Sequence, residues 1–427
     1  MKKVFIAIIL IIVVVLTAPK FIGGVVQTEY KSAFDKLNEN PAIIINSTAF
    51  TQNWFNGKSV TEMTIILESQ AIDDITIIIE ENLSFGPVIF TDEGVKFALN
   101  YSEADINFKD LIIDEEVSAF INDKLHLSSL LTYSKNVIAK IVIDEISKEV
   151  DGNNVVSAKA VGNFMVEENK RFSGDFNWAG LTATTKDESF TISVVEFSVD
   201  QTVIAGDFYQ GNAISTGDFD FSIASVNSQD AAGNTVMTLD NLLVSAVSTV
   251  SNDLMKINMN YHADKLVTAG QQLENANIAI VLDGFNINVM QEVNALMTAI
   301  SGEGEAMFNP ENMAKISALI EKLLADDPVI EITDLSVQTP EGKIESAMQV
   351  SVDKQLFDTA NMMSIMAAVQ ANAHGKAPMP FFTKLGGAAM VDMYVEQGFI
   401  IQKEQELSFQ VNFAQGQLKV NGNVIPL

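Results

Sequence analysis

The three histidines of the chain are its most versatile candidates for chemistry, and they lie far apart. His126, His262 and His374 form no HxH, HxxxH or HExxH spacing, the patterns that place imidazoles around one metal ion. The sequence contains no cysteine, which excludes disulfides, thiolate metal sites and cysteine nucleophiles. We therefore expect no metal site and no cofactor.

Carboxylates and serines offer the other routes to catalysis. Acidic doublets occur at Asp73-Asp74, Glu80-Glu81, Glu115-Glu116 and Asp326-Asp327. Adjacent residues on a strand point to opposite faces, so such doublets rarely form an acid and base pair, and we expect them at turns or solvated edges. The sequence has no GxSxG elbow, P-loop, GxGxxG or calcium loop. We predict no catalytic residue, with a hydrolase built from dispersed residues as a minor alternative.

Composition limits the partners of the chain. Its 427 residues carry a net charge of −29 at pH 7, which repels nucleic acid. The hydrophobic content of 48% is high for a water-soluble body. An N-terminal apolar segment supplies part of this excess, and the remainder predicts a large core or an apolar groove.

The first 26 residues suggest where the protein works. Lys2 and Lys3 precede an unbroken apolar run from Val4 to Ala18, and the run resumes after Lys20. A helix over residues 4–26 would be about 35 Å long, enough to cross a hydrocarbon core of about 30 Å. The residues before Pro19 make a poor cleavage site, and the two lysines favour a cytoplasmic N-terminus. We interpret residues 1–26 as an uncleaved signal-anchor, with a cleaved signal or a buried segment as alternatives.

A signal-anchor implies particular lipid-facing residues and a cellular location. The predicted membrane-anchor residues are Val4, Ile8, Ile12 and Leu16. They would hold the chain at a bacterial inner membrane, with the body in the periplasm.

Beyond the anchor, the apolar pattern divides the chain into three regions. Residues 27–135 read as a juxtamembrane helix to residue 39 followed by a hairpin region, with Asn56-Gly57 as the turn. Residues 136–289 alternate strands and turns with almost no helix signal, which predicts an antiparallel β meander. Residues 290–427 mix helices and strands.

Aromatic residues recur within the meander. The segment from Gly174 to Trp178 is echoed from Gly217 to Phe221, and Gly206-Asp207-Phe208-Tyr209 is a partial third copy. We expect each Gly-Asp pair to begin a strand whose aromatic side chains face the core, and a repeating hairpin unit is the alternative. The candidate residues for an apolar ligand surface are Phe176, Trp178, Phe219 and Phe221.

The C-terminal region is predicted to be largely helical. Helices are expected over residues 289–300, 310–324, 357–372 and 378–397, with Asn309 capping the second. Pro340-Glu341-Gly342 predicts a hairpin, and strands are expected over 399–403, 406–414 and 417–420. The methionines on these helices, which fill a core or form a pliable surface for a lipid or partner helix, are Met362, Met363, Met366, Met379, Met390 and Met393.

Short motifs along the whole chain resemble a known family. They are the segment Trp54 to Val60, Phe85-Gly86-Pro87, Asp327-Pro328 with its hairpin, and the closing segment from Gly416 to Gly422. The chain resembles the YdgA-like family of uncharacterised bacterial proteins, which are secreted or held at the inner membrane. Asn56 and Phe85 stand where that family has arginine and histidine, so the resemblance implies no catalytic role for these positions.

These observations combine into one expectation. We predict an α+β protein, mostly an antiparallel β meander forming a long curved sheet, with a helical C-terminal third and one transmembrane helix. We expect a non-enzymatic, membrane-tethered periplasmic protein that binds an apolar ligand or lipid along the sheet. The alternative is an envelope structural or assembly factor that acts through protein–protein contacts.

Overall fold

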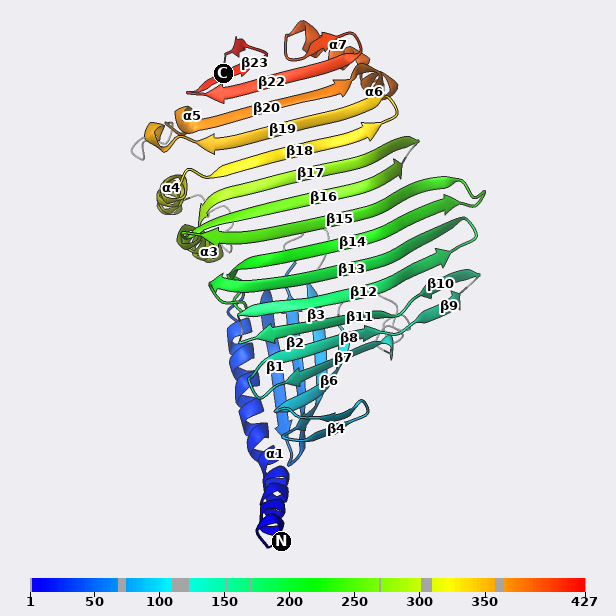
Figure 1. Cartoon of the computed structure of the whole chain (residues 1–427), viewed down its shortest axis with the longest axis vertical. Coiled ribbons are helices and arrows are strands. Elements are labelled where there is room, and N and C mark those ends of the chain that lie inside the picture. The colour runs from blue at the N-terminus through cyan, green and yellow to red at the C-terminus, as the bar shows by residue number, and fades with distance from the viewer. Residues whose placement is uncertain are drawn as a thin grey trace. The chain divides into compact units, whose positions relative to one another are not determined.

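The computed structural model describes residues 2–67, 74–109, 123–150, 152–168, 170–268, 270–300, 309–357 and 364–426. Its architecture is mainly antiparallel β, with 22 strands in one hydrogen-bonded sheet and a separate two-stranded hairpin (Figure 1). The predicted antiparallel meander is therefore confirmed. The predicted helical C-terminal third is wrong, because strands β18 to β24 occupy most of that region.

The chain divides into two compact units. Unit 1 comprises residues 1–148, 156–179 and 198–213, and unit 2 comprises residues 149–155, 180–197 and 214–427. Each unit is described separately below.

Unit 1 begins with one long helix, α1 (Lys2–Leu37). Two helices were expected here, but α1 continues through Pro19. Its second half packs on the sheet: Val26 is fully buried with Leu83 and Phe85, and Ile22 packs against them. The expected lipid-spanning segment 4–26 is therefore wrong at its C-terminal end, because packing against protein occupies that part of the helix.

The anchor residues lie on the first half of α1. Val4, Ile8 and Ile12 are in the helix, but their side chains lie outside the description, and Leu16 is half exposed. Within the described part of the chain, no helix combines the length and apolar character that a membrane crossing requires.

The strands of unit 1 pair in an antiparallel meander. β1 to β3, then β6 to β8, then β11 and β12 each pair with the next, while β4 and β5 form the separate hairpin. The strands that lie wholly or partly in unit 1 are β1 (Ile43–Gln52), β2 (Asn56–Ile65), β3 (Ile75–Phe85), β4 (Ile89–Thr91), β5 (Gly94–Lys96), β6 (Asn100–Phe108), β7 (Leu125–Leu131), β8 (Val137–Ile143), β9 (Ile146–Val150), β10 (Asn153–Ser157), β11 (Ala160–Glu167) and β12 (Arg171–Thr184).

The turn of the first hairpin lies earlier in the chain than the predicted Asn56-Gly57 position. Gln52 pairs with Gly57, so the turn comprises residues 53–56, where the Asn53 amide donates to the Asn56 carbonyl over 2.8 Å. Gly57 belongs to the strand, and a Cβ there would lie 2.9 Å from the Phe85 ring. The glycine that suggested a turn therefore permits close packing.

Unit 2 contains most of the remaining strands. β14 to β20 pair in sequence, and β22 then pairs with β20, β21 and β23. The strands are β13 (Glu188–Ala205), β14 (Ile214–Asp230), β15 (Thr235–Ser251), β16 (Leu254–Thr268), β17 (Gln271–Asn286), β18 (Val329–Thr339), β19 (Gly342–Val352), β20 (Val369–Pro378), β21 (Ile401–Lys403), β22 (Glu406–Ala414), β23 (Gln417–Val420) and β24 (Asn423–Ile425).

Two predicted helices of unit 2 are confirmed, α3 (Ile287–Ile300) and α4 (Pro310–Leu324). The Asn309 side chain caps α4 by accepting a 2.8 Å hydrogen bond from the Asn312 amide. The hairpin between β18 and β19 is also where Pro340-Glu341-Gly342 predicted it. Strands β22 and β23 have the predicted bounds.

The predicted helix over 357–372 is wrong. A 3-10 turn, η2 (Lys354–Leu356), precedes it, and only α5 (Ile365–Ala368) is helical in its described part. Val369 begins β20, whose alternating alanines pair with apolar residues on both neighbouring strands. Met362 and Met363 lie outside the described residues, as do Asp73, Glu115 and Glu116 of the acidic doublets. The predicted helix over 378–397 is split into α6 (Met379–Lys384) and α7 (Ala388–Glu396) by Gly386, whose φ is +77°.

The repeated Gly-Asp pairs do not begin strands. Gly174 and Gly217 lie inside β12 and β14, and Gly206-Asp207 lies in the connection between β13 and β14. A Cβ on Gly174 would lie 2.4 Å from the Phe164 ring, so this glycine makes room for an aromatic side chain on β11.

Candidate apolar ligand surface

A continuous row of apolar side chains crosses the sheet of unit 2. Residues that pair directly on antiparallel strands share a face, so the strand registers define the row. It runs through nine strands as Phe219, Ala246, Met259, Ile280, Ile332, Met348, Ala373, Val411 and Val420. No polar residue interrupts it.

A second row lies beside the first on the same face. It comprises Phe221, Val244, Tyr261, Ile278, Leu335, Ser346, Gly375 and Phe409. At its centre Tyr261, Ile278 and Leu335 are adjacent, and their exposed fractions are 39%, 38% and 41%. We refer to these two rows as the apolar face.

The opposite face of the same strands is polar. The intervening row contains Ser222, Leu243, His262, Asn277, Ser336, Glu345, Lys376 and Ser408. This alternation is typical of a sheet with one face intended for apolar contact and the other for water. His262 lies on the polar face, opposite to Tyr261, as predicted from their adjacency.

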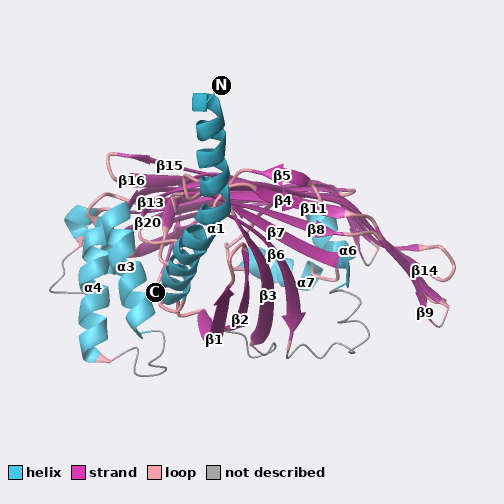
Figure 2. Cartoon of the chain, turned by 90° about the horizontal axis from the view of Figure 1, so that it is seen from below, coloured by secondary structure: helices cyan, strands magenta, loops and turns pink. Residues whose placement is uncertain are grey.

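Several side chains of the apolar face are exposed in the described part of unit 2, including Tyr261, Ile278, Leu335 and Met348. Helices α3 and α4 of unit 2 contact each other beside one end of the strands (Figure 1, Figure 2). Apart from the β4–β5 hairpin of unit 1, the described residues contain no second sheet that could pack over it. Exposed apolar side chains that lie next to one another in this way mark interaction surfaces.

The four predicted ligand residues separate into two pairs. Phe219 and Phe221 each begin one of the two rows of the apolar face, and Phe219 contacts Phe197 edge-on with ring centroids 5.5 Å apart. Phe176 and Trp178 belong to unit 1, where the Trp178 indole donates to the Ser157 hydroxyl over 3.1 Å. The candidate apolar surface of unit 2 therefore combines Phe219 and Phe221 with aliphatic residues that the sequence patterns did not single out.

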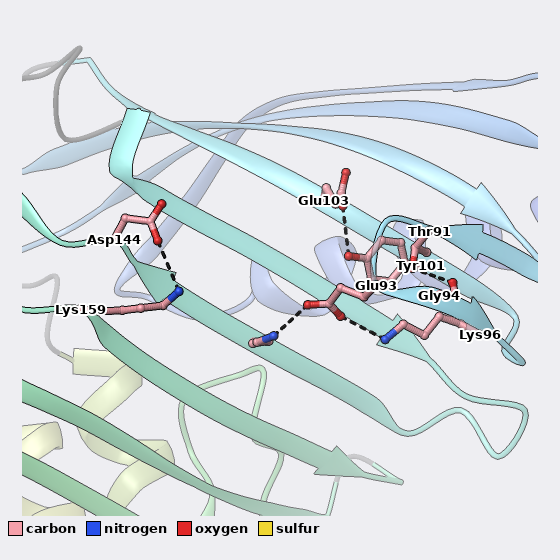
Figure 3. Close-up of polar contacts among 9 residues, drawn as sticks. Thr91, Glu93, Gly94, Lys96, Tyr101, Glu103, Asp144 and Lys159 are labelled. Atoms are coloured by element: carbon pink, nitrogen blue, oxygen red, sulfur yellow. Dashed lines mark hydrogen bonds and ion pairs between the residues drawn. The ribbon is translucent and has the colours of Figure 1, made fainter.

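Ionisable residues outside this surface form pairs. His126 lies 3.1 Å from Asp144, and His262 lies 2.9 Å from Asp264. In unit 1 the Glu93 carboxylate binds Lys96 and Lys140 at 3.0 and 2.8 Å (Figure 3), and hydrogen bonds from these lysines lower its pKa to about 2. The described residues hold no group of three or more histidine or acidic side chains that could bind a metal ion.

A buried polar cluster in unit 1 was not anticipated. The Tyr30 hydroxyl on α1 donates a 2.8 Å hydrogen bond to the Glu81 carboxylate on β3. Burial raises the pKa of Glu81 and, with the neighbouring carboxylate, the pKa of Tyr30. The expectation that Glu81 is a solvated edge residue is wrong, although Glu80 does face solvent. The sequence could not identify Glu81 as the buried acid, because adjacent residues on a strand point to opposite faces and the doublet does not show which of the two points inward.

Comparison with known families gives one match over the full length. The model of a family described as bacterial protein of unknown function (DUF945) matches residues 1–427. No match was found among curated proteins or among solved structures.

Proposed function

Since the chain belongs to the bacterial family of unknown function DUF945, we propose its role from the apolar face, as a non-enzymatic protein that binds acyl chains. The observation that supports this is the adjacency of Tyr261, Ile278 and Leu335, each about two-fifths exposed, beside the row from Phe219 to Val420 that no polar residue interrupts. Within the family, we propose that the chain is YdgA-like.

An acyl chain fits this surface on energetic grounds. Burial of apolar area contributes roughly 25 cal/mol per Å², and the methylene groups of a lipid need no hydrogen bonds. The strand registers place the apolar residues of the first row side by side without interruption, so a linear hydrocarbon can contact many of them at once. A polar ligand would find no donors or acceptors in the row that begins at Phe219 and ends at Val420.

We further propose that the N-terminal apolar run tethers the protein to the bacterial inner membrane, with the body in the periplasm. Support comes from the turn between β1 and β2, which lies against α1 and carries exposed aromatic residues. Trp54 and Phe55 are about half exposed, and Phe21 on α1 is 75% exposed. Such residues are enriched at membrane–water interfaces.

The acyl-chain proposal can be tested with matched substitutions on the two faces. Ile278 lies on the apolar face and Leu243 on the polar face, with exposed fractions of 38% and 39%. We expect Ile278→Asn to weaken binding of a fluorescent fatty acid at least tenfold and Leu243→Asn to leave it unchanged. Equal effects of the two substitutions, or no binding by the full chain, would contradict the proposal.

A second candidate function is envelope assembly through protein contacts. Met390, Met393 and Tyr394 form an exposed stripe along α7, with exposed fractions of 53%, 43% and 37%. Methionine-rich surfaces adapt to partner helices. A photocrosslinker at Met390 that captures one defined envelope protein in cells, together with failure of fatty-acid binding, would favour this function over the first.

A further inference from the structure

A cavity of about 580 Å³ lies in unit 1, between α1 and the sheet. Its floor includes Thr61 on β2, Glu81 on β3, Asn100 on β6 and Ser129 on β7. A sheet face that is covered by a helix is normally apolar, yet this floor is rich in hydroxyl, amide and carboxyl groups. The volume falls within the roughly 300–1,000 Å³ of small-molecule sites.

Two groups of the floor lack a partner. Thr61 and Asn100 are each 1% exposed, and among the described residues no group hydrogen-bonds to Thr61 Oγ1 or Asn100 Oδ1. An unsatisfied buried polar group costs about 1–3 kcal/mol, so proteins rarely retain one without a reason. Both side chains line the cavity, where a ligand can supply the missing hydrogen bonds.

The surrounding groups are held in place by their own network. The Ser102 hydroxyl bonds with the Ser129 hydroxyl over 2.8 Å and donates to Glu81 over 3.3 Å. Tyr30 donates to the same carboxylate. The floor therefore presents a fixed array of hydroxyl groups, each able to donate or accept.

Charge at the rim argues against an ionic ligand. Both lysines of the lining are already paired, Lys36 with Asp207 at 3.1 Å and Lys135 with Glu29 at 2.7 Å. The lining also contains Glu168, so an anion would meet a carboxylate rather than free cations. Burial of Glu81 favours its neutral form, which disfavours a cation.

We propose that this cavity binds an uncharged, polyhydroxylated ligand of the size of a sugar, with its hydroxyl groups on Thr61 and Asn100. The ring faces of such a ligand are apolar, and the lining also contains Phe34 and Tyr209, whose aromatic rings are suitable apolar contacts. The chemistry is shared by a free sugar and by the sugar headgroup of a lipid.

Binding can be measured on the full chain in nanodiscs by saturation-transfer NMR. The probes are free galactose, galactose 6-phosphate and galactosamine, with a separate arm in which the nanodiscs contain a monogalactosyl lipid. We expect saturation transfer from the protein to free galactose or to the galactose headgroup of the lipid. The saturation-transfer signals of the two charged probes should be at least tenfold weaker. Absence of binding in both neutral arms, or stronger binding of a charged probe, would overturn the proposal.

Substitutions separate a ligand site from a packing defect. Thr61→Val removes the unpartnered hydroxyl with little change of volume, so we expect an unchanged or higher melting temperature and at least tenfold weaker binding. Asn100→Leu should weaken binding similarly, whereas Thr51→Val, at an exposed threonine on the neighbouring β1, should not. Wild-type binding in a folded Thr61→Val variant would contradict the assignment.

Discussion

The indole nitrogen of Trp54 donates a 2.7 Å hydrogen bond to the backbone carbonyl of Leu16. A second bond, from the Gln52 side chain to the Lys20 carbonyl, lies one helical turn further along α1. Together they fix the β1–β2 turn against the helix at the point where its apolar run approaches the folded body. If the run before Leu16 enters lipid, Trp54 must lie at the membrane surface.

This geometry predicts the depth of Trp54 in a membrane. The chain has two tryptophans, so a Trp178→Phe variant reports on Trp54 alone. In vesicles we expect its fluorescence to be quenched by lipids brominated near the headgroup more strongly than by lipids brominated at the chain end. The Trp54→Phe variant, which reports on Trp178, should be quenched by neither. Equal quenching of both tryptophans would contradict the proposed tether.

Close packing at Gly23 predicts a size limit at that position of α1. A Cβ on Gly23 would lie 2.8 Å from the Phe85 ring, whereas nothing lies within 4 Å of a Cβ on Gly24. We expect Gly23→Leu to lower the free energy of unfolding of unit 1 by about 1–3 kcal/mol, the usual cost of overpacking. Gly24→Leu provides the matched control and should have little effect. Urea unfolding followed by tryptophan fluorescence measures both, and equal stabilities would show that α1 does not pack as described.

The ion pairs of Glu93 predict acid sensitivity of the β4–β5 hairpin. Its pKa falls from 4.5 to about 2 in the folded state, because Lys140 and Lys96 stabilise the carboxylate. The unfolded state therefore binds more protons between these pH values, so the stabilisation is complete above pH 4.5 and disappears as the pH approaches 2. The protection of the hairpin amides against hydrogen exchange, relative to the intrinsic exchange rate at each pH, should therefore decrease over this range in the wild type. Glu93→Gln should exchange faster at pH 6 and lose this pH dependence, whereas Asp92→Asn should retain it.

Sequence patterns predicted a helix or strand well where the signal depends only on residues close together in the chain. Alternation located most strands, and Asn309-Pro310 fixed the start of α4, because capping depends only on neighbouring residues. Gly57 and Gly174 misled, since a glycine needed for a turn and one needed for close packing look alike in sequence. Packing partners distant in the chain decided between them.

The candidate surfaces were harder to predict for the same reason. Phe219 and Phe221 stand out because they are aromatic, but the row they begin is completed by residues such as Ala373 and Val420. Only the strand registers bring these residues onto one face. Likewise, the carboxylate of Glu81 accepts a hydrogen bond from Tyr30, which lies 51 residues earlier in the chain, so no local pattern could reveal this contact.

The buried Tyr30–Glu81 pair predicts an unusual pH dependence of stability. Burial raises the pKa of Glu81 above 4.5, although hydrogen bonds from Tyr30 and Ser102 oppose this shift. The folded state therefore binds the proton more tightly than the unfolded state, and the contribution of Glu81 to stability decreases as the pH rises through its raised pKa. Glu81→Gln keeps an oxygen that accepts from Tyr30 and removes the titration. We expect this variant to gain stability relative to the wild type as the pH increases from 4.5 to 8.

Tyr30→Phe is the informative partner substitution, because it leaves the buried carboxylate without its 2.8 Å hydrogen bond. At a pH above the raised pKa of Glu81 it should cost about 1–3 kcal/mol, since a charged acceptor is left unsatisfied. In the Glu81→Gln background the same substitution should cost less, because the amide that remains is uncharged. Chemical denaturation of the four proteins of this cycle at pH 4.5 and pH 8 gives the coupling free energy between the two residues. A coupling that does not increase with pH would show that Glu81 does not ionise in contact with Tyr30.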